Sequence, residues 1–141
     1  GTDPDFHHIH GSLYRTRCHD CHRQIDGDLD LSEVPRCSEC GGILRPDVVL
    51  FGELLPTEAF DASVAAAERA DVCLLVGTSG IVYPAAGLPR QAKRNGAYLA
   101  EINTSSTELT DLCDATIRGS AGDLLPRIQK AVDHLRTAEA P

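Results

Sequence analysis

Residues 71–80 read DVCLLVGTSG, an apolar run that ends in a turn of small polar residues. Such a run is typical of a strand buried on both faces of a parallel sheet, and we place this strand over residues 71–76. The sequence predicts a helix on each side of it: one over 57–69, capped by Thr57, and one over about 84–95, closed by Gly96. Strands that alternate with helices predict an α/β fold with a Rossmann-like parallel sheet.

The same alternation continues toward the end of the chain. We predict further strands over 97–102 and 115–118, and a last helix that follows residues 119–122. Apolar residues recur along that helix at the spacing of one helical face, and the tail from Thr137 is expected to fray. Residues 44–52 lie between other turn signals and predict an extended segment before the first helix.

Ligands of such sheets bind beyond the carboxyl ends of the strands, and three short polar loops are expected there. Each loop alone is typical of an ordinary strand-to-helix turn, but three of them on one edge favour a nucleotide site. The usual glycine-rich dinucleotide fingerprint is absent from the sequence, so the spacing does not identify the nucleotide. The three loops are Gly77-Thr78-Ser79, Asn103-Thr104-Ser105 and Gly119-Ser120-Ala121.

Four of the six cysteines form two C-x-x-C pairs separated by fifteen residues. This spacing predicts one zinc ion held by four thiolates, and a shell of four protein ligands is structural rather than catalytic. Two disulfides, a redox pair or a ligand from one of the flanking histidines are the alternatives. Cys73 and Cys113 are expected to be ordinary core residues. The predicted zinc ligands are Cys18, Cys21, Cys37 and Cys40.

The composition narrows the class of protein further. The chain has 141 residues, with 13 basic and 21 acidic side chains and a formal charge of −8. An acidic chain without clustered Lys or Arg does not fit a nucleic-acid binder. No apolar run approaches the roughly 18–20 residues of a membrane span, and no leader is visible, which favours a cytoplasmic protein. The sequence opens on Gly1 rather than Met, so we expect it to be cut from a longer chain.

Three segments together resemble the sirtuin family. Residues 9–18, IHGSLYRTRC, resemble its catalytic segment, in which a His-Gly pair stands eight residues before the first zinc cysteine. Residues 44–53, LRPDVVLFGE, are similar to its substrate-binding segment, and residues 77–85, GTSGIVYPA, to its NAD-binding loop. The first of these segments and residues 82–89 resemble most the class III branch, whose members remove acidic acyl groups as well as acetyl groups.

This resemblance implies an NAD-dependent protein-lysine deacylase, in which an acyl group passes from lysine to the ribose of NAD. His10 would be the base that activates a ribose hydroxyl, since histidine side chains gain and lose a proton near neutral pH. Val49, through its carbonyl, and Phe51, through its ring, would flank the acyl-lysine, although Phe51 is also consistent with plain core packing. The resemblance assigns NAD contacts to Gly77, Thr78, Ser79, Asn103 and Ala121, and the polar loop after the strand over 97–102 adds Thr104 and Ser105 as candidates.

The resemblance covers the carboxyl half of a sirtuin and implies three regions. They are a catalytic-histidine segment over 1–12, a zinc-ribbon module over 13–45, and the carboxyl half of the NAD-binding domain over 46–141. In relatives, the segments that bind the pyrophosphate and nicotinamide of NAD precede the position that corresponds to Gly1. We therefore expect the isolated chain to be inactive.

Two residues depart from the family pattern. Asp47 and Leu50 stand where relatives usually carry His and Trp, and both positions lie in the segment that resembles the acyl-lysine groove. The second hypothesis is therefore a zinc-stabilised binding module without catalysis. The sequence leaves the acyl group (acetyl, succinyl or malonyl), the protein substrates and the oligomeric state open.

Overall fold

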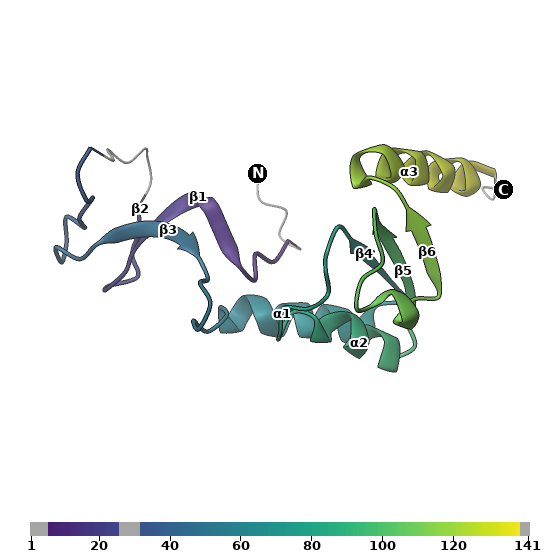
Figure 1. Cartoon of the computed structure of the whole chain (residues 1–141), viewed down its shortest axis with the longest axis horizontal. Coiled ribbons are helices and arrows are strands. Elements are labelled where there is room, and N and C mark those ends of the chain that lie inside the picture. Colours follow the sequence, from purple (N-terminus) through teal and green to yellow (C-terminus); the bar gives the residue numbers. More distant parts are fainter. Residues whose placement is uncertain (1–5, 26–31, 139–141) are drawn as a thin grey trace. The chain divides into compact units, whose positions relative to one another are not determined.

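The computed structural model describes residues 6–25 and 32–138. The chain forms two compact units, and the boundary between them falls after Ala62. Each unit contains one three-stranded sheet (Figure 1). No helix in the described ranges is long and apolar enough to cross a bilayer.

The first unit is built on an antiparallel sheet with the strand order β2-β1-β3. Its strands are β1 (Gly11–Cys18), β2 (Gln24–Ile25) and β3 (Leu44–Val48). The two end portions of β1 pair with β3, and the register shifts between them, from Ser12 to Thr16. Strand β3 lies within the extended segment predicted over 44–52, whereas β1 and β2 were not predicted. The alternation in β1 is weak, because Leu13 and Tyr14 are adjacent and both are exposed.

Helix α1 (Thr57–Arg69) has the bounds that the sequence predicts. The Phe60 amide donates a hydrogen bond to the carbonyl of Pro56 at 3.0 Å, which begins the helix. Phe60, Val64 and Ala67 are half-buried, as expected for one apolar face at helical spacing.

The second unit holds a parallel sheet with the strand order β4-β5-β6 (Figure 1). This confirms the predicted α/β class with a parallel sheet. The buried core consists of small and aliphatic side chains, as a chain with few aromatic residues requires. The elements are β4 (Val72–Val76), α2 (Gly87–Arg94), β5 (Tyr98–Asn103), the short 3₁₀ helix η1 (Thr110–Leu112), β6 (Ala115–Arg118) and α3 (Ala121–Ala138). The core residues are Leu75, Ala92, Ala97, Leu99 and Leu109.

Three details of the second unit differ from the prediction. Strand β4 is buried on one face only: Leu74 is 51% exposed whereas Leu75 is buried, because successive side chains point to opposite faces of the sheet. Helix α2 begins at Gly87 rather than near residue 84, because the chain first makes a turn in which the Gly87 amide bonds to the Pro84 carbonyl. Helix α3 includes Thr137, whose hydroxyl bonds to the carbonyl of Asp133 at 3.0 Å, and ends at Ala138; the rest of the tail that was predicted to fray lies outside the described residues.

Candidate functional site

Four cysteine sulfurs gather where β1 ends in the first unit. They all lie within 4.8 Å of one another, with separations of 3.5 Å for Cys18–Cys40 and 3.8 Å for Cys21–Cys37. The Cys37 amide donates to the Gly42 carbonyl at 2.7 Å and closes the second turn. A Cβ on Gly42 would come within 3.0 Å of the Cys18 sulfur, so the turn requires glycine beside the cluster.

The donor set fits a zinc ion. A tetrahedral shell with Zn–S bonds of ~2.3 Å has edges of ~3.8 Å, which matches the sulfur separations. The Cys21 amide lowers the pKa of the buried Cys18 thiol to about 7. The Gly42 amide also lowers the pKa of Cys40, but the thiols of Cys18 and Cys21 raise it, and the net value is about 12. A bound zinc ion would deprotonate the thiols that coordinate it. All six cysteines are free thiols, so no disulfide competes with this site.

A backbone hydrogen bond ties the predicted base to the predicted acyl-lysine segment. The Val49 amide donates to the His10 carbonyl at 3.1 Å, and Gly11 pairs with Val48 in the sheet. Gly11 has a φ of 76°, and a Cβ there would overlap the carbonyl oxygen of Asp47, so only glycine allows this close approach. His10 itself is exposed, which leaves its ring open to a ligand.

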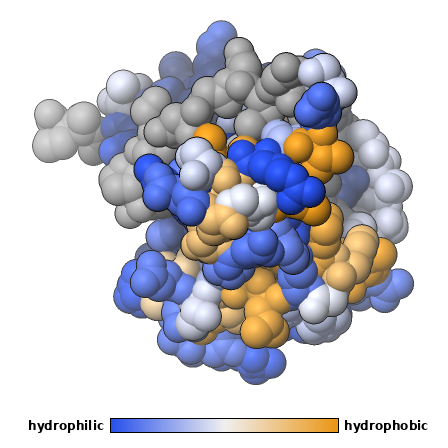
Figure 2. Space-filling model, turned by 90° about the vertical axis from the view of Figure 1, so that its left-hand side faces the viewer, coloured by the Kyte–Doolittle hydropathy of each residue, from blue (hydrophilic) through white to orange (hydrophobic). Residues whose placement is uncertain are grey.

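Phe51 lies in the turn after β3, and its side chain is 97% exposed. It is therefore not a core residue of the first unit, which was the alternative to a role in binding. Leu54 nearby is 94% exposed. Apolar side chains also reach the surface between polar ones in the space-filling view (Figure 2).

The turn that carries Val49 and Phe51 is held by an ion pair. The Arg45 guanidinium donates to both carboxylate oxygens of Glu53 and, at 2.8 Å, to the carbonyl of Val48. The Leu50 amide donates to the same carboxylate at 3.0 Å. Together these donors lower the pKa of Glu53 to about 2, with the Arg45 hydrogen bond as the main cause. Arg45, before the turn, and Glu53, after it, thus hold the turn together.

Val49 also lines a cavity of about 680 Å³ in the first unit, together with His7 and His8. Asp47 lies on the same wall, where its carboxylate faces the Arg15 and Arg17 side chains at 3.4 and 3.3 Å. The carboxylate that departs from the family pattern is therefore compensated by two guanidinium groups.

Two of the three predicted nucleotide loops meet in the second unit, and the loop over residues 119–121 does not line the cavity that they form. A cavity of about 440 Å³ is lined by five of the seven predicted NAD-contact residues. The side-chain amide of Asn103 donates to the Thr78 carbonyl at 2.9 Å, which joins the ends of β5 and β4. Thr104 and Ala121 do not line this cavity. The five lining residues are Gly77, Thr78, Ser79, Asn103 and Ser105.

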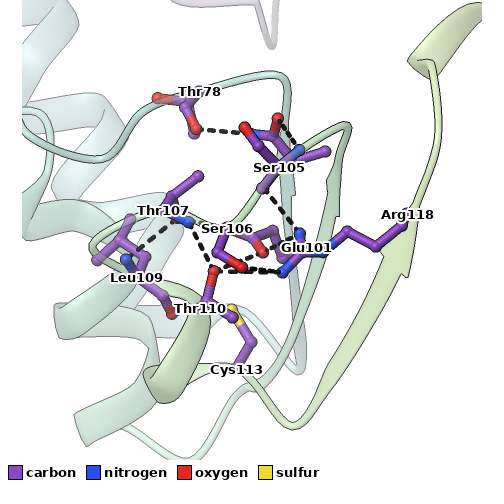
Figure 3. A network of polar contacts seen from close by, with 10 residues as sticks. Thr78, Glu101, Ser105, Ser106, Thr107, Leu109, Thr110, Cys113 and Arg118 are labelled. Carbon is purple, nitrogen blue, oxygen red and sulfur yellow. Dashed lines mark hydrogen bonds and ion pairs between the residues drawn. The ribbon is translucent and has the colours of Figure 1, made fainter.

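A buried carboxylate stands beside this cavity (Figure 3). Glu101 on β5 is fully buried and forms an ion pair with Arg118 on β6 at 2.6 Å. Burial raises the pKa of Glu101, but hydrogen bonds from Thr107, Arg118 and Thr110 outweigh it, so the net pKa is lowered. The carboxylate is therefore ionised inside the unit.

Glu101 and Arg118 were not predicted as functional residues, although the sequence contains a signal for them. Glu101 interrupts the otherwise apolar strand β5, and a charge in such a run indicates a buried partner. Arg118 ends the next strand, and adjacent parallel strands bring the two positions close. The ion pairs of Asp47 were missed for another reason, since its partners Arg15 and Arg17 lie on the unpredicted strand β1.

The comparisons with known proteins agree with each other. The Sir2 family model matches residues 1–84. A protein of Pyrobaculum aerophilum named NAD-dependent protein deacylase 2 is 50% identical over 94% of this chain and 54% of its own length. The NAD-dependent protein deacylase of Thermococcus kodakarensis is 42% identical over 88% of this chain and 51% of its own length. The chain thus spans about half the length of the curated relatives that it matches.

Solved structures give the same result. A Sir2 homologue mutant in complex with ADP-ribose superposes with a TM-score of 0.89 and 38% identity, over 95% of this chain and 55% of that one. A complex of a Sir2 homologue with NAD superposes with a TM-score of 0.85 and 40% identity, over 95% of this chain and 52% of that one. The structure of Sir2Af2 bound to a myristoylated histone peptide superposes with a TM-score of 0.79 and 39% identity, over 93% of this chain and 58% of that one.

Proposed function

The chain belongs to the Sir2 family, and from this premise we propose that it forms the base-bearing and acyl-lysine-binding part of an NAD-dependent protein-lysine deacylase. The observation that carries the proposal is the hydrogen bond between the Val49 amide and the His10 carbonyl, since it fixes the proposed base next to the proposed substrate segment. The names of the relatives support the same activity.

His10 acts as the general base in this proposal. Its ring is exposed, and its backbone is held by the strand pairing of Gly11 with Val48. An imidazole held in this way can accept a proton from a ribose hydroxyl that is placed against it. The acyl group then passes to that hydroxyl, and the lysine is released.

Val49 and Phe51 bind the acylated lysine. The Phe51 ring offers an exposed apolar surface to the lysine methylenes and the acyl chain. The Val49 carbonyl would accept a hydrogen bond from the amide nitrogen of the acyl-lysine. The relative Sir2Af2 was solved with a myristoylated peptide and Sir2Tm with a propionylated one, which supports acyl-lysine as the substrate class. We include acetyl and succinyl among the acyl groups, as the class III resemblance implies.

The cavity in the second unit takes the adenosine side of NAD. NAD supplies the ribose that accepts the acyl group when its nicotinamide leaves. The residues that line the cavity offer small side chains and backbone groups to the nucleotide, as the ends of parallel strands commonly do. We also assign two residues outside the cavity lining to this side, Thr104 from its place in the loop after β5 and Ala121 from the resemblance. The zinc of the four cysteines is structural, because no ligand position is left for water.

The experiment joins this chain to the amino-terminal half of a Sir2 relative. We expect the joined protein to release acetyl or succinyl groups from lysine peptides in the presence of NAD, and the isolated chain to release none. The binding-module hypothesis predicts a different result: a folded, zinc-loaded joined protein that binds peptide and NAD but never turns over. That outcome would overturn the proposed function.

A further inference from the structure

We propose that Glu101 is a positioning residue for the nucleotide cavity: paired with Arg118, it holds residues 103–110 in the shape that forms one wall. The inference rests on the proposed function, because it takes this cavity as the adenosine site. Glu101 does not line the cavity, so it acts through the residues that it holds.

Both oxygens of the Glu101 carboxylate bind the segment that follows β5 (Figure 3). The Thr107 hydroxyl donates to Oε1, and the Thr110 hydroxyl donates to Oε2 at 2.8 Å. Thr107 also receives a hydrogen bond at its hydroxyl oxygen from the Leu109 amide, at 3.1 Å. The carboxylate thereby sets the path of the chain from the cavity wall into η1.

Arg118 extends the same network to the other end of the wall. Its Nη1 donates to Glu101 at 2.6 Å and to the carbonyl of Ser105 at 2.9 Å, and its Nη2 donates to the Ser106 hydroxyl at 3.3 Å. Ser105, Ser106 and Thr107 line the cavity. Each of these lining residues is therefore one hydrogen bond away from the ion pair.

The stability of the core does not explain this carboxylate. Burying a charge is costly, and replacing a buried ion pair by apolar side chains of similar size is often neutral or stabilising. An apolar residue at position 101 would fill the same space beside Leu99 and Ile102. What it would lack is the directional hydrogen bonds, which come from Thr107 and Thr110 in that segment and from Arg118, which itself bonds to Ser105 and Ser106.

The test compares Glu101→Gln with Asp114→Asn in the 141-residue chain. Asp114 is a matched control, since it also pairs with a cation, Lys93 at 2.5 Å, and accepts the Leu99 amide at 2.8 Å. It precedes β6, at the opposite end of the strands from the cavity. NMR measures two quantities for each protein: amide hydrogen exchange in residues 105–110, and the ADP-ribose dissociation constant from shifts of the cavity amides at millimolar ligand.

We expect Glu101→Gln to speed exchange in residues 105–110 and to weaken ADP-ribose binding about tenfold, as the loss of a charged hydrogen-bond acceptor predicts. Asp114→Asn should change neither, even where it lowers the unfolding midpoint as much. Unchanged exchange and affinity in a folded Glu101→Gln chain would overturn the inference, as would an equal loss of affinity in Asp114→Asn.

Two further variants keep the test valid if Glu101→Gln does not fold. Thr110→Val removes one donor without changing the shape of the side chain, and Arg118→Lys keeps the charge but loses the contacts to Ser105 and Ser106. Both should speed exchange and weaken ADP-ribose binding, and a folded pair that does neither also overturns the inference. If the wild-type chain shows no ADP-ribose shifts while the variants still loosen residues 105–110, the proposed nucleotide site fails and the holding role of Glu101 stands.

Discussion

The amide of Val49 donates a hydrogen bond to the carbonyl oxygen of His10 at 3.1 Å. The zinc-ribbon cysteines lie between these two residues in the sequence, so the hydrogen bond joins the two ends of the zinc-ribbon segment. It uses only backbone atoms, and the side chains of both residues stay available for other partners. A change of the His10 ring should therefore leave the Val49 segment in place, whereas a change at Gly11 should displace both.

The first prediction concerns the metal. Purified chain should contain about one zinc ion, and Cys37→Ser should lose it and unfold, since structural zinc contributes on the order of 10 kcal/mol to such modules. Cys73→Ser serves as the control, because Cys73 packs against the core of the second unit and is not one of the four clustered cysteines. Metal analysis and circular dichroism give the readout. A folded chain without metal would contradict the assignment.

The second prediction separates steric overlap from backbone strain at Gly11. Gly52 has a comparable φ of 89°, but a Cβ there would meet no atom within 4 Å. Both alanine variants strain the backbone, because each position has a positive φ. Only in Gly11→Ala would the new Cβ also overlap the Asp47 carbonyl oxygen. Urea unfolding should show a loss for Gly11→Ala that exceeds that for Gly52→Ala by about 1–3 kcal/mol, the usual cost of overpacking. Equal losses would show that β1 and β3 can separate locally without cost.

Local patterns in the sequence were enough to predict α1, the parallel strands and the cysteine cluster. Each of these depends on residues within a few positions of one another: the start at Thr57, the apolar run of β4, the two C-x-x-C turns. Strand β1 was missed because Leu13 and Tyr14 are adjacent and both exposed, so the sequence lacks the apolar–polar alternation that would indicate a strand paired with β3. The Glu101–Arg118 pair was missed because it joins two strands, and only the packed sheet brings them together.

The third prediction is a pH dependence. Arg45 holds the pKa of Glu53 at about 2 in the folded chain, below the ordinary carboxyl value of about 4.3. A lowered pKa stabilises the fold above the ordinary value, and the effect is lost as the pH falls toward 2. The gap in urea midpoint between wild type and Glu53→Gln should therefore be largest near pH 6 and shrink between about pH 4 and 2. Arg45→Gln should show the same loss, and a gap that does not change with pH would refute the ion pair as the cause.

The fourth prediction is that the isolated chain binds NAD weakly. The cavity wall in the described part of the chain carries one charged side chain, the carboxylate of Glu108, and no basic one. A dinucleotide diphosphate needs cations or helix-terminal amides, and this cavity offers it a like charge instead. Calorimetry should detect no micromolar binding, while millimolar NAD should shift the amides of Gly77 and Thr78. Micromolar affinity would show that this half alone is sufficient.

The last prediction concerns the base, in the protein joined to the amino-terminal half of a Sir2 relative. His10→Ala should abolish NAD-dependent deacylation, because His10 is the only histidine in residues 9–18, and histidine is the side chain suited to proton transfer near neutral pH. Zinc content and the unfolding midpoint should stay unchanged, since the contact to Val49 uses the backbone of residue 10. His7 and His8 provide the matched controls: both lie within three residues of His10 and line the cavity of the first unit, and neither precedes the Gly11 turn directly. We expect His7→Ala and His8→Ala to keep most of the turnover. If His10→Ala turns over as fast as the wild type, the base lies elsewhere, and a loss in His8→Ala alone would identify it.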